Sequence, residues 1–409
     1  MGNVVEVLDG LMSTGKSTEV LKWIDSNPNN RYIFVSPLLT EVEEGGRVCS
    51  SVSNVTFECP SVSEYETKSE HLLQLLKDGS NIACTHSLYL AVNDDHLKYI
   101  KELEYILIID EEIDVISSVD GYSKDDYQWL YDNDKITVSS SDGMVSWVCA
   151  IPVGRDNKYH KFKMLCDYQA LYVTKRNSNM MVTQLPIKLM TCAKRVIVLT
   201  YMFKGNILDC FLKLKGIEVV SFDDVTISKV NGDEIRSLIT LLPLNKTVSD
   251  LALSSTWYSE ANKAQLDTVG RYISAVGRKY CENFDDLMYT LPKSRHLSKN
   301  SSKNVIKPPK FYRKRDGGEW KYNWLPAQLR ATNDYRNKKV VVHCFNRFPM
   351  VDVASYLADY ECNIDTPKFS TSEMVQWIWR SQIRSKKPIV VGIANKRMHK
   401  LFSQWLKSL

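Results

Sequence analysis

The sequence has little that would place the protein in a membrane or bind a metal through cysteine. No apolar run approaches the ~20 residues that a membrane-spanning helix needs, which excludes a helical membrane protein. The first residues lead directly into a strand-like segment without a basic and then apolar stretch, so we expect no signal peptide. The 10 cysteines are scattered, with no C-x-x-C pair and no histidines at metal-ligand spacing. We therefore expect reduced, mostly buried thiols and a cytoplasmic protein.

Length and composition permit a large core. With 409 residues and 44% hydrophobic content, the chain is expected to form two domains. The net charge of +5 is mild and indicates little until the positions of the basic residues are considered. Residues 291–315 contain no acidic residue, although the chain as a whole is 25% charged. The basic residues of this segment are Lys293, Arg295, Lys299, Lys303, Lys307, Lys310, Arg313, Lys314 and Arg315.

Strand-like and helix-like patterns alternate through the first half of the chain, which predicts an α/β fold with a parallel sheet. The expected strands are residues 4–8, 32–35, 81–85, 105–109 and 195–199. The expected helices are residues 16–26, 64–78 and 95–103. Residues 117–194 are less regular, with helical pieces expected at 125–131 and 168–171, and we interpret them as an insertion.

The same alternation returns after a predicted linker at residues 222–233. The second domain is expected to open with the apolar run at 238–242, and strands are expected at 340–345 and at 388–393. Helices are expected at 262–276, 282–287, 371–385 and 395–406. The second half is therefore predicted to be another α/β domain, interrupted by the basic segment.

A glycine-containing loop follows the first expected strand. Residues 10–17 have the sequence G-L-M-S-T-G-K-S, which is the spacing of a phosphate-binding loop between a strand and a helix. Glycines let backbone N–H groups surround an anion, and the following helix directs its positive end toward the phosphates. Lys16 would contact the β- and γ-phosphates, and the Ser17 hydroxyl would bind Mg²⁺. The expected nucleotide-binding residues are Gly10, Ser13, Thr14, Gly15, Lys16, Ser17 and Thr18.

An acidic motif follows the apolar strand at residues 105–109. It has the sequence D-E-E-I-D and begins at Asp110. A carboxylate at the end of a buried strand can bind the same Mg²⁺ as Ser17, and the next carboxylate can orient or deprotonate the attacking water. We therefore assign Asp110 to the metal and Glu111 to catalysis. Solvated carboxylates at a strand end are the alternative, which the upstream phosphate-binding loop makes less favourable.

These motifs, in this order, resemble those of superfamily 1 and 2 helicases, and within them the compact DEAD-like helicases of phages. Residues 10–17 look like motif I, residues 110–114 like motif II, and residues 199–201 stand where motif III couples hydrolysis to strand movement. Other segments resemble motifs Ia, Ib and IV. The resemblance implies nucleic-acid contacts at Ser36, Pro37, Thr85, His86 and Asn346.

Residues 376–384 resemble motif VI, which supplies arginine fingers to the γ-phosphate in that family. The resemblance makes Gln376, Arg380 and Arg384 candidate catalytic residues. The family spaces its two arginines three apart, whereas here they are four apart. Both are still expected on one side of the helix at 371–385, because positions i and i+4 are neighbours on a helix. A solvated basic face with buried tryptophans is the alternative interpretation.

The basic segment favours a nucleic-acid interface, because Lys and Arg contact phosphates without regard to sequence. Lys310, Arg313, Lys314 and Arg315 are the expected contacts. Aromatic residues in and after the segment could stack on unpaired bases. They are Tyr312, Trp320, Tyr322 and Trp324. The alternative is a solvated loop, since such a run is too polar to form a packed element on its own.

The resemblance implies two RecA-like P-loop domains with parallel sheets and an insertion in each. The first would span residues 1–225, with its insertion at about 117–194, and the second residues 232–409, with its basic insertion at about 291–335. It further implies ATP and Mg²⁺ between the domains, single-stranded or forked DNA as partner, possible contacts with phage replication proteins, and the host cytoplasm. A remodelling or counter-defence ATPase without unwinding remains an alternative, as does a P-loop phosphotransferase.

Overall fold

The protein divides into two compact units. The computed structural model describes residues 4–62, 65–119, 121–150, 153–154, 156–175, 180–296, 306, 313–316, 319–327 and 335–409. The first unit comprises Met1–Gly10, Gly15–Ile227 and Pro349–Asp365. The second comprises Leu11–Thr14, Ser228–Phe348 and Thr366–Leu409.

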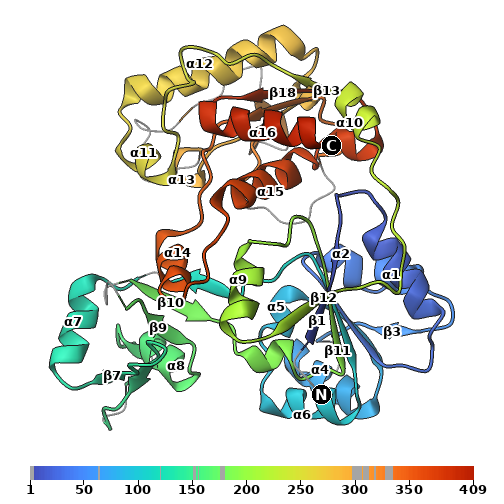
Figure 1. The fold of residues 1–409 in the computed structure, drawn as a ribbon, viewed down its shortest axis with the longest axis vertical. Helices are drawn as coiled ribbons and strands as arrows, with labels where there is room; N and C mark the ends of the chain where they lie inside the picture. Colours follow the sequence, from blue (N-terminus) through green and yellow to red (C-terminus); the bar gives the residue numbers. More distant parts are fainter. Residues whose placement is uncertain are drawn as a thin grey trace. The chain divides into compact units, whose positions relative to one another are not determined.

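A seven-stranded sheet forms the centre of the first unit (Figure 1), with the order β12-β1-β11-β5-β2-β4-β3. All neighbouring strands are parallel. The strands are β1 (Val4–Asp9), β2 (Tyr32–Ser36), β3 (Phe57–Glu58), β4 (Asn81–Thr85), β5 (Ile106–Asp110), β11 (Arg195–Thr200) and β12 (Glu218–Ser221). The run Ile106–Ile109 is buried on both faces, as expected of a central parallel strand.

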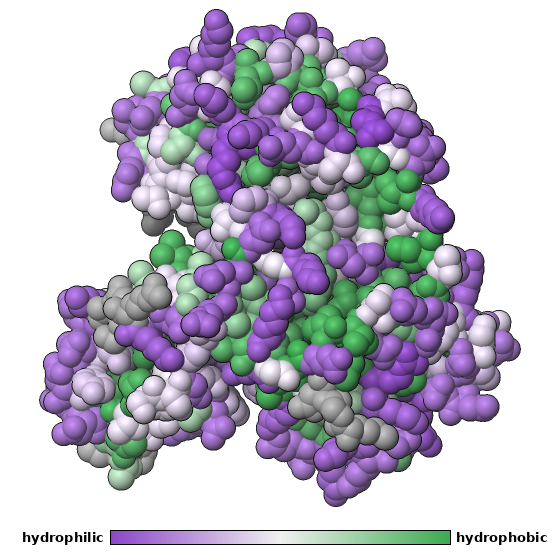
Figure 2. Space-filling view, in the orientation of Figure 1, coloured by the Kyte–Doolittle hydropathy of each residue, from purple (hydrophilic) through white to green (hydrophobic). Residues whose placement is uncertain are grey.

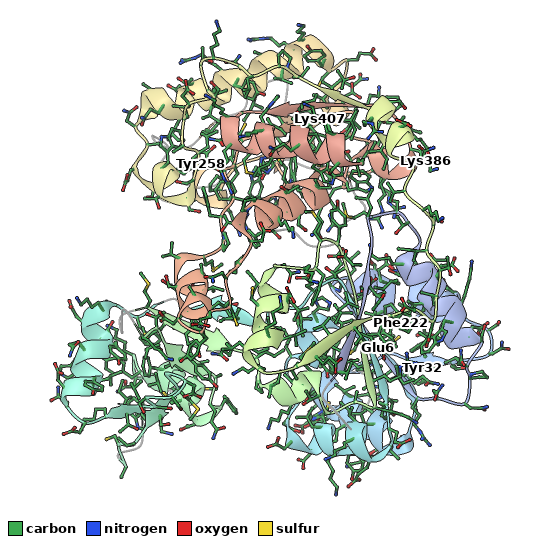
Figure 3. All side chains as sticks on the ribbon, in the orientation of Figure 1. Glu6, Tyr32, Phe222, Tyr258, Lys386 and Lys407 are labelled. Atoms are coloured by element: carbon green, nitrogen blue, oxygen red, sulfur yellow. The ribbon has the colours of Figure 1, made fainter. Side chains whose placement is uncertain are left out.

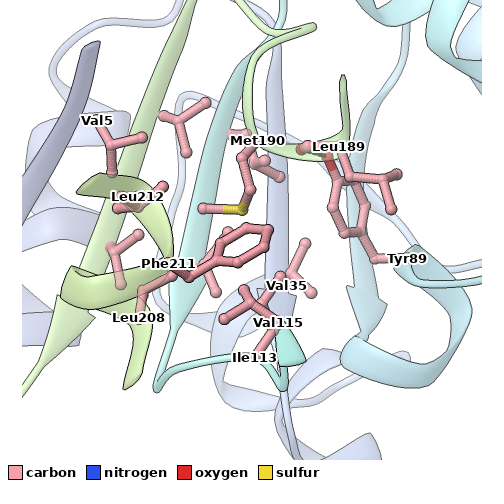
Figure 4. Close-up of a cluster of buried hydrophobic side chains, with 14 of the residues drawn as sticks. Val5, Val35, Tyr89, Ile113, Val115, Leu189, Met190, Leu208, Phe211 and Leu212 are labelled. Atoms are coloured by element: carbon pink, nitrogen blue, oxygen red, sulfur yellow. Dashed lines mark hydrogen bonds between the residues drawn. The ribbon is translucent and has the colours of Figure 1, made fainter. Parts of the chain in front are cut away.

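Helices cover both faces of this sheet. They are α1 (Lys16–Asp25), α2 (Leu39–Val42), α3 (Arg47–Ser50), α4 (Lys68–Asp78), α5 (His86–Tyr89), α6 (Asp94–Glu102), the 3-10 helix η1 (Ile187–Met190) and α9 (Ile207–Leu214). One core includes residues of α1 and α3, and the other includes residues of α4, α6 and α9. Figure 4 shows part of the second core, where Phe211 and Met190 pack together and the Tyr89 hydroxyl donates to the Leu189 carbonyl at 2.6 Å.

An ion-pair network joins β11 to its neighbour β1. The Arg195 guanidinium donates to both carboxylate oxygens of Glu6, at 2.7 and 2.6 Å, and also to Asp224 at 2.9 Å. The same guanidinium lies 5.5 Å from the centre of the Phe222 ring. Glu6 and Phe222 are labelled in Figure 3. Because the pair with Glu6 is bidentate, it fixes the register as well as the charge balance of these strands.

The predicted insertion has a small core of its own. Its strands are β6 (Ile116–Ser118), β7 (Ile136–Val138), β8 (Val145–Trp147), β9 (Leu171–Val173) and β10 (Met181–Gln184), and its helices are α7 (Lys124–Asp132) and α8 (His160–Asp167). Strands β6, β10 and β9 form one antiparallel sheet, and β7 pairs with β8. The predicted helix at residues 168–171 is wrong, because α8 has already ended and Leu171 begins β9.

A segment from late in the chain belongs to the first unit. Helix α14 (Val351–Ala358) buries Leu357 in the same core as the sheet and lies beside β10 in Figure 1. The Tyr356 hydroxyl donates to the Asp142 carbonyl at 2.8 Å, and the Asp365 N–H donates to the Gly205 carbonyl at 2.8 Å. The compact units therefore differ from the predicted domains, which assigned all of residues 232–409 to the second.

The second unit contains a four-stranded parallel sheet with the order β13-β18-β17-β14. Its strands are β13 (Ile239–Leu241), β14 (Leu287–Thr290), β17 (Val340–His343) and β18 (Ile389–Ile393). Its helices are α10 (Gly232–Leu238), α11 (Ser255–Glu260), α12 (Lys263–Tyr280), α13 (Lys293–His296), α15 (Thr366–Ile378) and α16 (Lys396–Ser408), with 3-10 helices η2 (Phe284–Asp286) and η4 (Gln382–Ser385). Hydrophilic residues predominate on the face of this unit seen in Figure 2.

Two helices predicted for the second unit, at 282–287 and 371–385, are wrong in type or bounds. The helix expected at 282–287 is replaced by η2 and the start of β14, because the Asp286 carboxylate accepts from the N–H groups of Glu282 and Asn283 and turns the chain. The helix expected at 371–385 begins earlier and ends at Ile378. The basic segment is not wholly without regular structure, since β15 (Arg313–Asp316) pairs antiparallel with β16 (Glu319–Tyr322).

The predicted fold class is confirmed: the chain is α/β, with two units that are each built on a parallel sheet. All ten cysteines are free thiols, of which six are partly buried and four are fully buried. In the part of the chain that the structure describes, no helix is both long and apolar enough to cross a membrane.

The position of α14 leads to a stability prediction. We expect Leu357→Ala to lower the free energy of unfolding of the first unit by about 2–5 kcal/mol, because Leu357 is fully buried in its core. Hydrogen exchange measured by mass spectrometry should show faster exchange in β6 and β10, with little change in β17 and β18. Val351→Ala is the control, since that side chain is 65% exposed. Faster exchange confined to the second unit would contradict the assignment of α14.

Candidate nucleotide-binding site

The candidate site lies at the carboxyl edge of the seven-stranded sheet. The loop at residues 10–15 follows β1, Ser36 ends β2, Thr85 ends β4, Asp110 ends β5 and Thr200 ends β11. Because all these strands are parallel, their carboxyl ends meet at one edge, which is where α/β proteins bind ligands. The sequence motifs of the first domain therefore converge, although they are spread over some two hundred residues.

The loop after β1 has the backbone of an anion-binding turn. Ser13 and Gly15 adopt left-handed conformations, with φ of 66° and 90°. Gly15 is also the N-cap of α1 and supplies no side-chain bond to the N–H groups of the first turn. Those N–H groups and the positive end of the helix favour a phosphate at this position. The Thr14 hydroxyl supports the turn by donating to the Leu11 carbonyl at 2.8 Å.

Lys16 and Ser17 begin α1, and each contacts a different part of the site. The Lys16 ammonium donates to the Gly10 carbonyl across the loop. The Ser17 hydroxyl donates to Oδ1 of Asp110 at 2.9 Å. Two residues 93 positions apart in sequence, both predicted to bind Mg²⁺, are thus in direct contact. Thr18 is exposed on the outer side of the same turn.

The carboxylate of Asp110 is placed where its charge is costly. Burial raises the pKa of Asp110, and the nearby Arg47 guanidinium opposes that rise. Nη2 of Arg47 lies 3.3 Å from Oδ2 of Asp110, and the Ser17 bond also favours the ionised form. The neighbouring positive charge of Arg47 and the Ser17 hydrogen bond therefore favour the ionised form of Asp110 against the effect of burial.

The donor set fits Mg²⁺ bound together with a nucleotide. Mg²⁺ takes one or two protein oxygens and completes its shell with water and phosphate oxygens, and Ser17 with Asp110 would provide this pair. Among the described residues, no group of three or more His, Cys, Asp and Glu side chains could hold a metal by itself. The site is thus suited to a metal that arrives with phosphates.

The next two carboxylates are held in different ways. Glu111 has a φ of 63°, which is unusual for a residue with a side chain, and its N–H donates to the Leu199 carbonyl at 3.0 Å. Such conformations cluster at functional sites, where the surrounding structure maintains the strain. Glu112 accepts hydrogen bonds from the Thr200 hydroxyl and the Asn206 amide.

Glu112 and Asn206 were missed by the sequence analysis. Together they connect the acidic motif to Thr200, which lies in the segment that resembles motif III. Asn206 also caps α9, since its side chain accepts from the Asp209 N–H at 2.8 Å. An Asn before the apolar run at 207–214 is a helix-start signal that could have identified it.

The predicted nucleic-acid residues of the first unit lie at the same edge. Ser36 is buried and its hydroxyl oxygen lies 3.4 Å from the Leu38 N–H, while Pro37 is partly buried. Thr85 caps α5 by accepting from the Leu88 N–H at 3.3 Å. Nε2 of His86 lies 2.9 Å from the Asp110 carbonyl oxygen. The sheet edge therefore joins a candidate nucleic-acid segment directly to the acidic motif.

The candidate residues of the second unit are placed differently from the prediction. Arg380 is buried just beyond α15, and Arg384 is partly buried in η4, so they do not share one helix. The helix ends because the chain turns at Ser381, whose hydroxyl donates to the Ile378 carbonyl at 2.7 Å. Gln376 remains on α15 and donates to the Ser372 hydroxyl at 2.9 Å.

The remaining residues predicted to contact nucleic acid are Asn346 and those of the basic segment. Asn346 is buried, donates to the Ala252 carbonyl at 3.0 Å and accepts from Arg397 at 2.9 Å. Lys310 and Tyr312 lie outside the described residues. The backbone of Arg313, Lys314 and Arg315 forms β15. Trp324 is partly buried against the core of the second unit and donates to the Leu291 carbonyl at 2.9 Å.

Comparisons with known proteins found a family, a relative and a solved structure to which this chain is similar. The profile of a family described as "YonV C-terminal Rossmann-like domain" matches residues 233–406. A protein of Bacillus subtilis (strain 168), the SPbeta prophage-derived uncharacterized protein YonV, is 29% identical over 433 residues, covering 99% of each chain. The structure of S. tokodaii Xpd4 is 13% identical and aligns with a TM-score of 0.47, covering 98% of this chain and 94% of the other.

The buried carboxylate leads to a prediction about pH. Because the pKa of Asp110 is raised in the folded state, ionising it destabilises the fold at neutral pH, and this penalty disappears as the pH falls below 3.8. We therefore expect Asp110→Asn to raise the melting temperature of the ligand-free protein at pH 7, with the gain shrinking as pH is lowered toward 4. The exposed Asp250 provides the control variant Asp250→Asn, which should melt like the wild type. A gain that grows on acidification would contradict the assigned direction.

Proposed function

We propose that the protein is an ATP hydrolase that uses Mg²⁺ and acts on nucleic acid as a translocase or helicase. The observation that carries the proposal is the contact between Ser17 and Asp110 at the mouth of an anion-binding loop. This arrangement is the one that P-loop nucleotide hydrolases use to bind the metal of a metal–nucleotide complex. The motif order along the sequence supports a helicase-like enzyme over other members of that class.

Each residue of the site has a role in this proposal. The N–H groups after Gly15 and the ammonium of Lys16 would bind the β- and γ-phosphates. Ser17 and Asp110 would orient the metal, which supplies charge stabilisation to the transferred phosphoryl group. Glu111 would position the attacking water and accept its proton. On sequence grounds, Arg380 and Arg384 are candidates for the charge-stabilising arginine, and Gln376 for a supporting contact.

A path for nucleic acid is the second part of the proposal. Ser36, Pro37, Thr85 and His86 lie at the edge that holds Asp110, and the His86 contact with its carbonyl offers a direct link between strand binding and hydrolysis. The acid-free segment at 291–315 would add phosphate contacts. Single-stranded or forked DNA is the proposed partner, and a prophage-derived relative fits a phage protein acting in the host cytoplasm, with replication proteins as possible partners.

The first functional prediction separates nucleotide binding from hydrolysis. We expect Lys16→Ala to weaken ATP binding and abolish turnover, because a phosphate contact is lost. Glu111→Gln should abolish turnover while ATP still binds, because Ser17 and Asp110 are unchanged. Binding of a fluorescent ATP analogue and phosphate release measure the two effects. Wild-type turnover in both variants would refute the proposed ATPase.

The second functional prediction concerns the basic segment. Replacing Lys310, Arg313, Lys314 and Arg315 together by Ala should weaken oligonucleotide binding at every sequence about equally, because phosphates carry no sequence information. The dependence of affinity on salt should become shallower, by up to ~0.7 units of log–log slope for each lost contact to a single strand. Fluorescence anisotropy across a salt series tests this. Unchanged affinity and slope would assign the strand to another surface.

A further inference from the structure

Arg47 occupies a position next to Asp110 that no sequence motif identified. Its Nη2 lies 3.3 Å from Oδ2 of Asp110, and its Nε donates to Oε2 of Glu41 on α2. The Ser17 hydroxyl donates to the other oxygen, Oδ1. Both oxygens of the Asp110 carboxylate therefore have a protein partner. A metal ion that binds this carboxylate must displace one of these two partners or bind an oxygen that also keeps its partner.

The local backbone is built to place Arg47 there. Gly46 is the N-cap of α3, and a Cβ at this position would lie 2.8 Å from the carbonyl oxygens of both Glu41 and Glu43. Only glycine fits such a close approach. Val48 is completely buried, and the Cys49 thiol lies 3.4 Å from the Cys59 thiol, so the short helix is anchored directly after Arg47.

The exposure of the three charged side chains shows which of them can move. The side chains of Glu41 and Asp110 are each 14% exposed, whereas that of Arg47 is 36% exposed. The more accessible cation can therefore leave Asp110 without breaking the core, and Glu41 remains beside it as a second partner. A divalent cation and a guanidinium on one carboxylate oxygen repel each other, so the two compete.

We propose that Arg47 is a positioning residue that acts as the counter-ion of Asp110 in the nucleotide-free protein and yields this carboxylate to Mg²⁺ when the nucleotide enters. This inference rests on the proposed function. Arg47 then remains paired with Glu41, and its departure from Asp110 leaves Oδ2 available to the metal. The arrangement keeps the metal affinity of the empty site low, so that metal binding depends on the phosphates.

The test is Mn²⁺ binding to the full-length, nucleotide-free protein, measured by electron paramagnetic resonance. Arg47→Gln should bind Mn²⁺ about tenfold more tightly than the wild type, because an arginine beside a carboxylate changes its proton affinity by at least that factor. Arg47→Lys should give an intermediate affinity, since the charge remains but the planar fork is lost. Arg31→Gln is the matched control, because Arg31 is exposed and its guanidinium donates to the Leu103 carbonyl at 3.3 Å.

Two further measurements separate the inference from the proposed function. The Mg²⁺ concentration for half-maximal ATP hydrolysis should fall in Arg47→Gln, and adding Asp110→Asn should remove the gain in Mn²⁺ affinity. An Arg47→Gln protein that melts as a folded protein but binds Mn²⁺ no more tightly than the wild type overturns the inference. Binding of a fluorescent ATP analogue to the wild-type protein then separates the two cases. If the wild-type protein binds the analogue, the inference alone fails. If it does not bind the analogue, the proposed function fails as well.

Discussion

The contact between Ser17 and Asp110 is the constraint on which the rest of the site depends. A carboxylate buried at the end of a central strand is costly unless hydrogen bonds and positive charge compensate it. Here a hydroxyl supplies the hydrogen bond and Arg47 supplies the charge. The fold thus keeps a buried negative charge on Asp110 that destabilises the ligand-free protein. The positive metal ion of a metal–nucleotide complex would compensate this charge. Sites that bind strongly charged ligands are commonly destabilised in this way.

The parallel sheet converts this local constraint into a connected site. His86 reaches the main-chain carbonyl of Asp110 from the end of β4, and Glu112 bonds to Thr200 at the end of β11. Movement of Asp110 on ligand binding would therefore be transmitted to the ends of β4 and β11. Because β11 lies between β1 and β5, Thr200 also accepts, through its carbonyl, the N–H of Gly10 at 3.1 Å. These contacts form one continuous path from the phosphate-binding loop to the candidate nucleic-acid segment.

The sequence predicted those features that depend on short stretches of chain. The phosphate-binding loop and the acidic motif are local patterns beside strong strand signals, and their meeting at one sheet edge follows from parallel topology. Arg47 could not be predicted, because its importance arises from a contact with a residue 63 positions away. The same is true of α14, whose apolar face is buried against the first unit although its sequence neighbours belong to the second. The helix over Arg380 and Arg384 was predicted too long because burial of Trp379 and the turn at Ser381 outweighed helical periodicity.

The measurement that tests the account most directly is the rate of phosphate release from ATP by the wild-type protein, with and without single-stranded DNA or RNA. The account predicts Mg²⁺-dependent hydrolysis that a single strand accelerates at low salt, with the acceleration fading as salt rises. Acceleration by only one of the two nucleic acids would identify the partner. No hydrolysis under any of these conditions, or transfer of the phosphoryl group to a small-molecule acceptor in place of water, would contradict it.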